Sequence, residues 1–367
     1  QFCRVYFKDV PDDTTLIRWA NLVKAETLAA FNQRVTKMAT QLKVTRGRKL
    51  RTDGTVVETN IHAPSDSHLL EDSVRVIGRT LQRAKQVISK QTGLADQVFR
   101  NRIRSARKTG RQIRRLITRQ KEAGKQAYRK LVKITKQTVD QAKQVLETLA
   151  ELSDDPAQGL RDTLETFIPR AEQVIDQTIR RVFQDEKVPA EDKIVSIFEP
   201  HTAIIRRGKA GKPVEYGRKV WLDEVEGGIV TRWEVLDGNP SDKLQWVPSL
   251  DAHQQLFGKT PTQASADRGV FSSDNETTAK NRGVKRVVLP KPGKKSGKRR
   301  QHEKQPWFRR ARNWHAGVEG RISVLKRCYH LDRCLNQGQD GFHRWVGWGV
   351  IAHNLNKIGS TVVARSE

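Results

Sequence analysis

The sequence predicts an α/β protein in which helices flank a mixed sheet. Strand-forming segments occur before residue 60 and again after residue 189, and the later ones alternate with helical segments. Between them, residues 67–187 show helical periodicity throughout. The order hairpin, helix, strand, helix, strand after residue 189 predicts a sheet with parallel members. The long helical stretch separates the first strand from the others.

The first helix is expected in "PDDTTLIRWANLVKAETLAAF" (residues 11–31), which opens with a Pro-Asp-Asp-Thr helix start. Apolar residues then recur at helical spacing: Leu16, Ile17, Ala20, Leu22 and Val23. This helix either docks on DNA or packs against the next domain. The chain has no signal peptide and begins at Gln1 without Met, so we expect an upstream segment.

The segment "LRTDGTVVET" (residues 50–59) is rich in β-branched residues, which favour a strand, although aspartate is depleted in strands. Asp-Gly between alternating apolar residues is also a strong hairpin signal. Taken alone, the segment leaves open whether Asp53 turns the chain or lies inside a sheet for its chemistry.

The helical stretch 67–187 carries apolar residues at helical spacing from Val74 to Leu149, and Pro156 and Pro169 are expected to break it. Asp66 precedes it and is interpreted as an N-cap or first-turn acid. Basic residues fill its polar faces: Arg100, Arg102, Arg104, Arg107, Lys108, Arg111, Arg114 and Arg115. The stretch is a solvated bundle or one with a phosphate-contacting face, and the sign of the charge favours the second.

After residue 189, "DKIVSIF" (192–198) predicts a strand, and the strands "GRKVWLDEV" and "IVTRWEVLDG" predict a hairpin around residues 226–228. A helix capped near Ser241 or Asp242 follows. Next come a short buried strand in "TQASAD", a helix in "SSDNETTAKNRG" and a strand in "VKRVVLP".

A basic loop, "PKPGKKSGKRRQHEKQP", leads from the last strand to the closing helices. One helix is expected from about Trp307 to Lys326, and the final one spans "GFHRWVGWGVIAHNLNKIG". The loop cations that we expect to hold phosphates are Lys294, Lys295, Lys298, Arg299 and Arg300.

The net charge of +28 indicates a polyanionic partner, because neutralising phosphates releases counterions and gives sequence-independent affinity. No apolar run approaches the roughly 18 residues of a membrane-spanning helix, so nucleic acid is the better candidate. No aromatic ladder accompanies the charge, which disfavours a single-strand-binding module. Cys3, Cys328 and Cys334 are too few and scattered for a disulfide framework or a zinc site.

Two further acids stand out. Asp267 follows the strand in "TQASAD", and catalytic groups concentrate at the carboxyl ends of strands in open α/β sheets. Its alternative role, a turn aspartate ahead of a helix, is better filled by Ser272, Ser273 or Asp274. Glu319 lies in a basic helix, yet it has no Lys or Arg at ion-pair spacing.

Gly317 and Gly320 flank Glu319 and cost helix propensity, about 1 kcal/mol each relative to Ala. They indicate that a sheet or DNA approaches this helix closely. Arg312, His315 and Lys326 on the same helix could contact phosphates.

Three carboxylates on a strand, a second strand end and a late helix suit metal-dependent phosphodiester chemistry. Carboxylate oxygens hold Mg²⁺ while leaving positions for water and phosphate. Two such ions, about 3.5–4 Å apart, activate the attacking oxygen and stabilise the leaving one. Periodicity and composition alone do not assign the three acids to one site.

The segments "RTDGTVVETNIHAPSDSHLL", "GKPVEYGRKVWLDEVEGGIVTRWEVLDGNPSD", "ASADRGVFS" and "VEGRISVLKRCYHLDRCLNQG" resemble bacterial insertion-sequence transposases of the DDE class, which have an RNase H-like catalytic domain. The resemblance implies that Asp53, Asp267 and Glu319 are the catalytic, metal-binding carboxylates. Gly54 would then keep the place beside Asp53 open for metal and DNA. Related transposases often carry Tyr, Arg, Glu and Lys around the last acid; here Glu319 and Lys326 agree, whereas Arg312 and His315 differ.

The resemblance also implies a domain plan. Residues 1–45 would be a truncated N-terminal DNA-binding region, residues 46–66 and 190–367 the RNase H-like catalytic domain, and residues 67–189 a basic all-helical insertion in its sheet.

The expected activity is metal-dependent cleavage at the ends of an insertion sequence, followed by strand transfer into target DNA. The expected cofactor is two Mg²⁺ ions, for which Mn²⁺ can substitute. The partners would be double-stranded DNA (terminal inverted repeats and target) and a second copy in a synaptic complex, with no membrane, in the bacterial cytoplasm at the nucleoid. The alternatives are an inactive DNA-binding relic and a nuclease of the same fold that cuts without joining.

Overall fold

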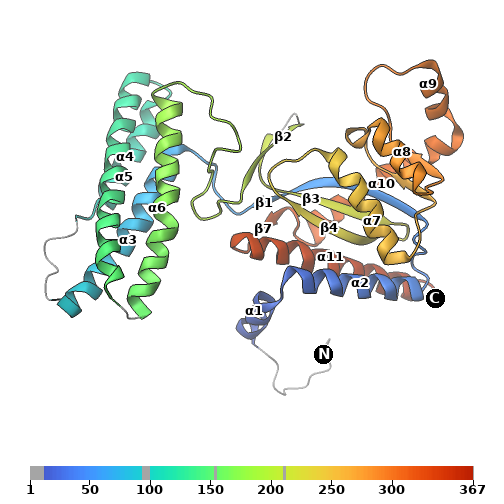
Figure 1. The fold of residues 1–367 in the computed structure, drawn as a ribbon, viewed down its shortest axis with the longest axis horizontal. Helices are drawn as coiled ribbons and strands as arrows, with labels where there is room; N and C mark the ends of the chain where they lie inside the picture. The colour runs from blue at the N-terminus through green and yellow to red at the C-terminus, as the bar shows by residue number, and fades with distance from the viewer. Residues whose placement is uncertain (1–11, 93–99, 153–154, 210–211, 367) are drawn as a thin grey trace. The chain divides into compact units, whose positions relative to one another are not determined.

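The computed structural model of the chain describes residues 12–92, 100–152, 155–209 and 212–366 (Figure 1). It divides into two compact units: a sheet unit, residues 1–60 with 205–367, and a helical unit, residues 61–204. A mixed sheet flanked by helices confirms the predicted α/β class. Cys3 lies outside the described residues, and Cys328 and Cys334 are free thiols.

The sheet is built around β1 (Lys49–Thr59). Within the described residues it has seven strands, in the order β2-β3-β1-β5-β6, with β4 paired to β3 and β7 to β1. The other strands are β2 (Ala203–Lys209), β3 (Lys212–Val225), β4 (Ile229–Leu236), β5 (Gln263–Ser265), β6 (Arg286–Val288) and β7 (Arg333–Cys334). Because β1 is antiparallel to β3 and parallel to β5, the predicted mixed sheet is confirmed.

Asp53 lies inside β1, opposite Leu222 of β3, so the chain does not reverse at Asp53-Gly54. Alternation along the strand sends Gly54 to the other face, where it pairs with Trp221. A Cβ at Gly54 would lie 3.3 Å from the Trp221 ring. The prediction that Gly54 keeps the metal site open is therefore wrong, since Gly54 makes room for a buried tryptophan.

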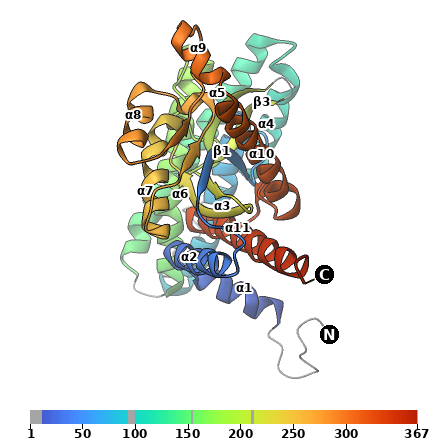
Figure 2. The same ribbon diagram turned by 90° about the vertical axis from the view of Figure 1, so that its right-hand side faces the viewer.

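Helices cover both faces of the sheet. On the Gly54 face, buried residues of β1, β3 and β5 pack with α7 (Trp246–Phe257) and α8 (Ser273–Asn281). On the Asp53 face, Val57 and Leu222 pack with α10 (Pro306–Cys328) and α11 (Gly338–Val363). Figure 2 shows α10 alongside β1, which it contacts. Asp53 therefore faces the helix that carries Glu319.

The predicted order after the β3–β4 hairpin is confirmed: a short 3₁₀ helix (η1, Asp242–Gln245) runs into α7, followed by β5, α8 and β6. Gly227 and Gly228 in the hairpin turn have φ of 88° and 79°, which glycine adopts without strain. The predicted basic loop after β6 is wrong in part. Helix α9 (Gly297–Lys304) begins within it, with Ser296 as its N-cap.

The single N-terminal helix predicted is wrong, because Val23 and Lys24 are extended and separate α1 (Asp13–Leu22) from α2 (Ala25–Gln41). Helix α2 packs against α11 and β4, and Asn32 donates to the carbonyl oxygens of Val230 and Thr231. Four of the five predicted apolar residues (Leu16, Ile17, Ala20 and Leu22) lie on α1, which buries none of its residues. Packing on the domain is thus a property of α2.

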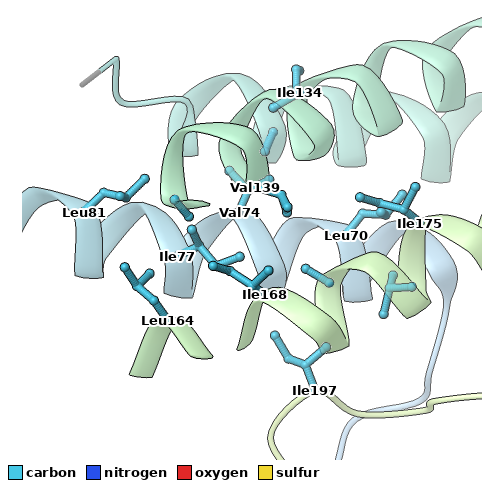
Figure 3. Packing of buried hydrophobic residues seen from close by; sticks show 14 of the residues in the cluster. Leu70, Val74, Ile77, Leu81, Ile134, Val139, Leu164, Ile168, Ile175 and Ile197 are labelled. Atoms are coloured by element: carbon cyan, nitrogen blue, oxygen red, sulfur yellow. The ribbon is translucent and has the colours of Figure 1, made fainter. Parts of the chain in front are cut away.

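The helical unit consists of α3 (Asp66–Thr92), α4 (Ile103–Leu116), α5 (Lys121–Ala150) and α6 (Asp155–Val182). Figure 3 shows its buried side chains: Val74 and Ile77 of α3 lie near Ile168 of α6, and Leu70 lies beside Ile175. The predicted break at Pro169 is wrong: α6 continues through it. Ile168 and Ala171, on either side of the proline, pack in the core, and this packing outweighs the unfavourable helix propensity of one proline.

The predicted strand at residues 192–198 is also wrong, because no ladder forms there. Its apolar residues Ile194 and Ile197 join the helical core instead. In place of strand-to-strand hydrogen bonds, the Gln177 side chain bonds the backbone of Ile194. It accepts from the Ile194 N–H at 3.0 Å and donates to the Ile194 carbonyl oxygen at 3.2 Å. Asp66 is the expected first-turn acid of α3, and its carboxylate accepts from Gln177 and Arg181.

Ser272 caps α8, as its Oγ accepts from the Asn275 N–H at 3.0 Å. We expect Ser272→Ala to lower the free energy of unfolding of the sheet unit by about 1 kcal/mol, the usual cost of a lost N-cap. All eight tryptophans lie in the sheet unit, so their fluorescence reports its unfolding in urea. Ser273→Ala is the matched control; an equal loss there would contradict the capping role.

Candidate active site

A cavity of about 670 Å³ in the sheet unit is lined by Asp53, Asp267 and Glu319 together. The three carboxylates come from β1, from the turn after β5 and from α10. They are far apart in the sequence and meet because β1 and β5 are parallel neighbours and α10 contacts both strands. The structure therefore brings together the three acids that were expected to share a site.

Each acid is held differently. Asp53 is half-buried, and its Oδ1 accepts from the Gly54 N–H at 2.7 Å. Asp267 is exposed and caps the 3₁₀ turn η2 (Arg268–Val270) by accepting from the Gly269 N–H at 2.8 Å. Glu319 is exposed on α10. Asp267 thus has a turn role as well as a place in the cavity, whereas Ser272 caps the helix that follows.

The donor set suits a hard divalent cation, because carboxylate oxygens at an open cavity are the ligands that Mg²⁺ takes. Among the described residues, no group of three or more His, Cys, Asp or Glu side chains stands close enough to hold a metal ion. Asp53, Asp267 and Glu319 have the right ligand chemistry for such an ion. Their side chains would have to rotate to bring their oxygens onto a common ion.

Cationic side chains share the cavity wall with the acids: Arg268, Lys291, Lys295 and Arg312. Lys295 and Arg312 were expected from the sequence, whereas Arg268 and Lys291 were not. Arg268 directly follows Asp267 after β5, and Lys291 follows β6, the next parallel strand. The signal that could have found them is their position at the carboxyl ends of neighbouring parallel strands.

The other expected phosphate contacts need correction. Lys326 does not line the cavity, and its Nζ donates to the Val56 carbonyl oxygen of β1 at 2.7 Å. Arg299 is engaged within the fold: it pairs with Glu276 at 2.6 Å and Glu303 at 2.8 Å and lies over the Phe271 ring. Both cations hold elements of the sheet unit together.

The remaining basic residues near α9 differ in exposure. Lys295 also pairs with Glu303 at 2.5 Å while lining the cavity. Lys294, Lys298 and Arg300 are exposed and remain the part of this segment that is open to a phosphate backbone.

His315 lines the cavity but is buried, and burial with the nearby charge of Arg51 lowers its pKa to about 4. It is therefore neutral at pH 7 and offers no positive charge to a phosphate. The predicted phosphate contact of His315 would therefore be made by a neutral ring.

Arg51, two residues before Asp53, fixes α10 against the sheet. Its guanidinium pairs with Glu224 of β3 at 2.7 and 2.9 Å and donates to the Trp314 carbonyl oxygen of α10 at 2.5 Å. A Cβ at Gly317 would lie 2.5 Å from this guanidinium, so Gly317 permits the close approach predicted from the sequence. Gly320 has open space within 4 Å.

Burial also lowers the pKa of His253 and His353 to about 4. Each folded-state pKa lies below the unfolded value of about 6.5, so the unfolded chain binds protons first as the pH falls. We expect the free energy of unfolding to decrease between about pH 6.5 and pH 4, with no further loss from these groups below that. Urea midpoints from tryptophan fluorescence across this range test it.

Two variants serve as a comparison. His315→Gln should make stability depend less steeply on pH, whereas His62→Gln, at an exposed position, should leave the pH dependence unchanged. Urea midpoints that stay unchanged from pH 7 to about pH 4 would contradict the claim that three buried imidazoles are neutral in the folded protein.

Residues 274–359, from α8 to α11, match the family described as transposase DDE domain. The resemblance to DDE-class insertion-sequence transposases is confirmed. The matched residues include Glu319 and lie after Asp53 and Asp267. The match supports a transposase function, for which DNA is the substrate and a divalent metal the general cofactor.

No curated protein and no solved structure matches the chain. Through the described part of the chain, no helix combines the length and apolar composition needed to cross a membrane.

Proposed function

We propose that the chain is a metal-dependent DNA transposase that cleaves a phosphodiester at each end of its element and joins the freed 3′-OH to target DNA. The observation that carries this is the cavity at which Asp53, Asp267 and Glu319 converge beside four cations. The transposase match over the segment that contains Glu319 supports the same function.

In this proposal Asp53, Asp267 and Glu319 would hold two Mg²⁺ ions, for which Mn²⁺ could substitute. When bound, such ions lower the pKa of the attacking water or hydroxyl and neutralise charge on the leaving oxygen. The protein orients the DNA: Arg268, Lys291 and Arg312 lie where a phosphate facing the acids would need charge neutralisation.

Two reactions follow at this site. Water attacks phosphorus and the 3′ oxygen leaves as a hydroxyl, which exposes the 3′ end. That hydroxyl then attacks a target phosphodiester, so one P–O bond forms as another breaks and no external energy source is needed.

The test uses the full chain with duplexes that carry the ends of its element, in Mg²⁺ and in EDTA. We expect cleavage and joining of pre-cleaved ends in Mg²⁺ and neither reaction in EDTA. Cleavage without joining would identify a nuclease of this fold, and binding without either reaction would identify an inactive relic.

The predicted domain plan, with residues 67–189 as an insertion, belongs to the same proposal. So do a homodimer or larger synaptic complex and a location at the bacterial nucleoid.

A further inference from the structure

Helix α4 of the helical unit carries a stripe of cations, none of which is among the residues that line the cavity of the sheet unit. Five exposed residues line a shallow hollow of about 740 Å³ on this helix: Arg104, Arg107, Lys108, Arg111 and Arg115. Their positions i, i+3, i+4, i+7 and i+11 fall within an arc of about 100° on a helix of 3.6 residues per turn. The stripe is therefore a single face.

The opposite face of α4 is fixed in the core. Ala106, Thr109, Gly110 and Ile113 are buried, and Ala106 and Ile113 pack in the main cluster of the helical unit. A Cβ at Gly110 would lie 2.5 Å from the Glu71 carboxylate, so α4 approaches α3 closely at this point. This packing fixes the direction in which the cations point.

The structure separates these five cations from their basic neighbours. Arg114 pairs with Glu71 at 3.2 Å, and Arg102 donates to Gln137 at 3.2 Å. No aspartate or glutamate occurs between residues 97 and 121. Like charges at i, i+3 and i+4 destabilise a helix, so a stripe with no acidic residue on its own helix indicates a polyanionic partner.

We propose that this face of α4 binds the phosphate backbone of duplex DNA independently of sequence. From Arg104 to Arg115 the stripe is about 16 Å long at 1.5 Å per residue. A stripe of this length covers about five base-pair steps of the duplex axis, at about 3.4 Å each, so it matches the scale of a phosphate backbone. This inference relies on the proposed function only for DNA as the polyanion.

The packing and composition of α4 argue against two other polyanions, an anionic membrane and a single-stranded nucleic acid. A helix that lies on an anionic membrane needs an apolar face free for the lipid, and that face of α4 is buried. Single-stranded nucleic acid is bound by aromatic stacking, and α4 contains no aromatic residue. A duplex backbone needs only exposed cations at suitable spacing.

The test measures binding of the full chain to two unrelated duplexes by fluorescence anisotropy over a salt titration. Arg107→Gln/Arg111→Gln removes two stripe cations at i, i+4 spacing. We expect it to reduce the slope of log K against log salt by about 2, at roughly 0.9 per lost contact. The affinity should fall by the same factor on both duplexes, because phosphate contacts carry no sequence information.

Arg79→Gln/Arg83→Gln is the matched control, with two exposed arginines at the same spacing on α3. It should change the slope much less. A wild-type slope in the α4 variant, or an equal change in the α3 variant, would overturn the proposal. So would loss of binding to anionic phosphatidylserine vesicles with DNA binding unchanged.

The same preparations separate this inference from the proposed function. Wild-type protein that binds DNA through α4 but does not cleave in Mg²⁺ would refute the transposase proposal and leave the α4 surface intact. Normal cleavage together with unchanged binding by the α4 variant would refute the α4 surface alone.

Discussion

Asp53→Asn and Asp267→Asn should each reduce Mg²⁺-dependent cleavage by more than about 100-fold while leaving DNA binding in EDTA unchanged. Mutation of residues that merely support a metal ligand costs about 10–100-fold, and a direct carboxylate ligand contributes more. Both acids line the cavity with Glu319. Rates are measured on element ends at saturating protein, so that the chemical step is compared.

Two controls sharpen this prediction. Asp332→Asn changes an exposed acid that does not line the cavity, and it should retain wild-type rates. The double variant Asp53→Asn/Asp267→Asn should be little worse than either single one, because residues that act as a unit are not additive. Multiplicative losses would show that the two acids act separately.

Arg51→Met should lower the free energy of unfolding of the sheet unit by about 3 kcal/mol, near the lower end for a broken buried ion pair. Only 1% of the Glu224 side chain is exposed, and the change leaves this carboxylate with Arg321 at 3.3 Å as its ion-pair partner. Tryptophan fluorescence in urea measures the loss, since every tryptophan lies in this unit.

Arg51→Met/Glu224→Met is the matched double variant. It should recover most of the stability, because replacing a whole buried pair by apolar residues is often close to neutral. Losses that simply add would contradict direct coupling between Arg51 and Glu224.

Much of the sheet could be predicted from sequence, because local signals agree with the final structure there. The β3–β4 hairpin, the Ser272 cap and the strands that flank α8 all have turn or cap residues at the expected positions. The segment 192–198 could not be assigned in this way, since a short apolar run does not distinguish a strand from a buried irregular segment. Its hydrogen-bond partner, Gln177, is 17 residues away.

Asp267 and Glu319 were easier to single out from the sequence than the roles of the cations. Asp267 was indicated by its place after a buried strand, and Glu319 by the lack of a helical ion-pair partner. Lys326 and Arg299 have partners set by tertiary contacts: the Val56 carbonyl oxygen is 270 residues from Lys326, and Glu276 is 23 residues from Arg299, which also pairs locally with Glu303. Charge alone therefore overestimated the surface available to DNA.

The lowered pKa of His315 likewise depends on tertiary structure. It follows from burial against the sheet and from the nearby charge of Arg51. Periodicity placed this side chain on the same helix as Glu319 but gave no measure of its burial.

We propose one metal-dependent site that includes the Glu319 carboxylate of α10, which lies within the segment that matches the transposase DDE domain. The most direct measurement is Mg²⁺-dependent cleavage of the element ends by wild type and by Glu319→Gln, which keeps the size of the side chain and removes its charge. We expect the variant to bind the ends like wild type and to cleave them more than about 100-fold more slowly. Equal cleavage rates would remove Glu319 from the site and contradict the proposed mechanism.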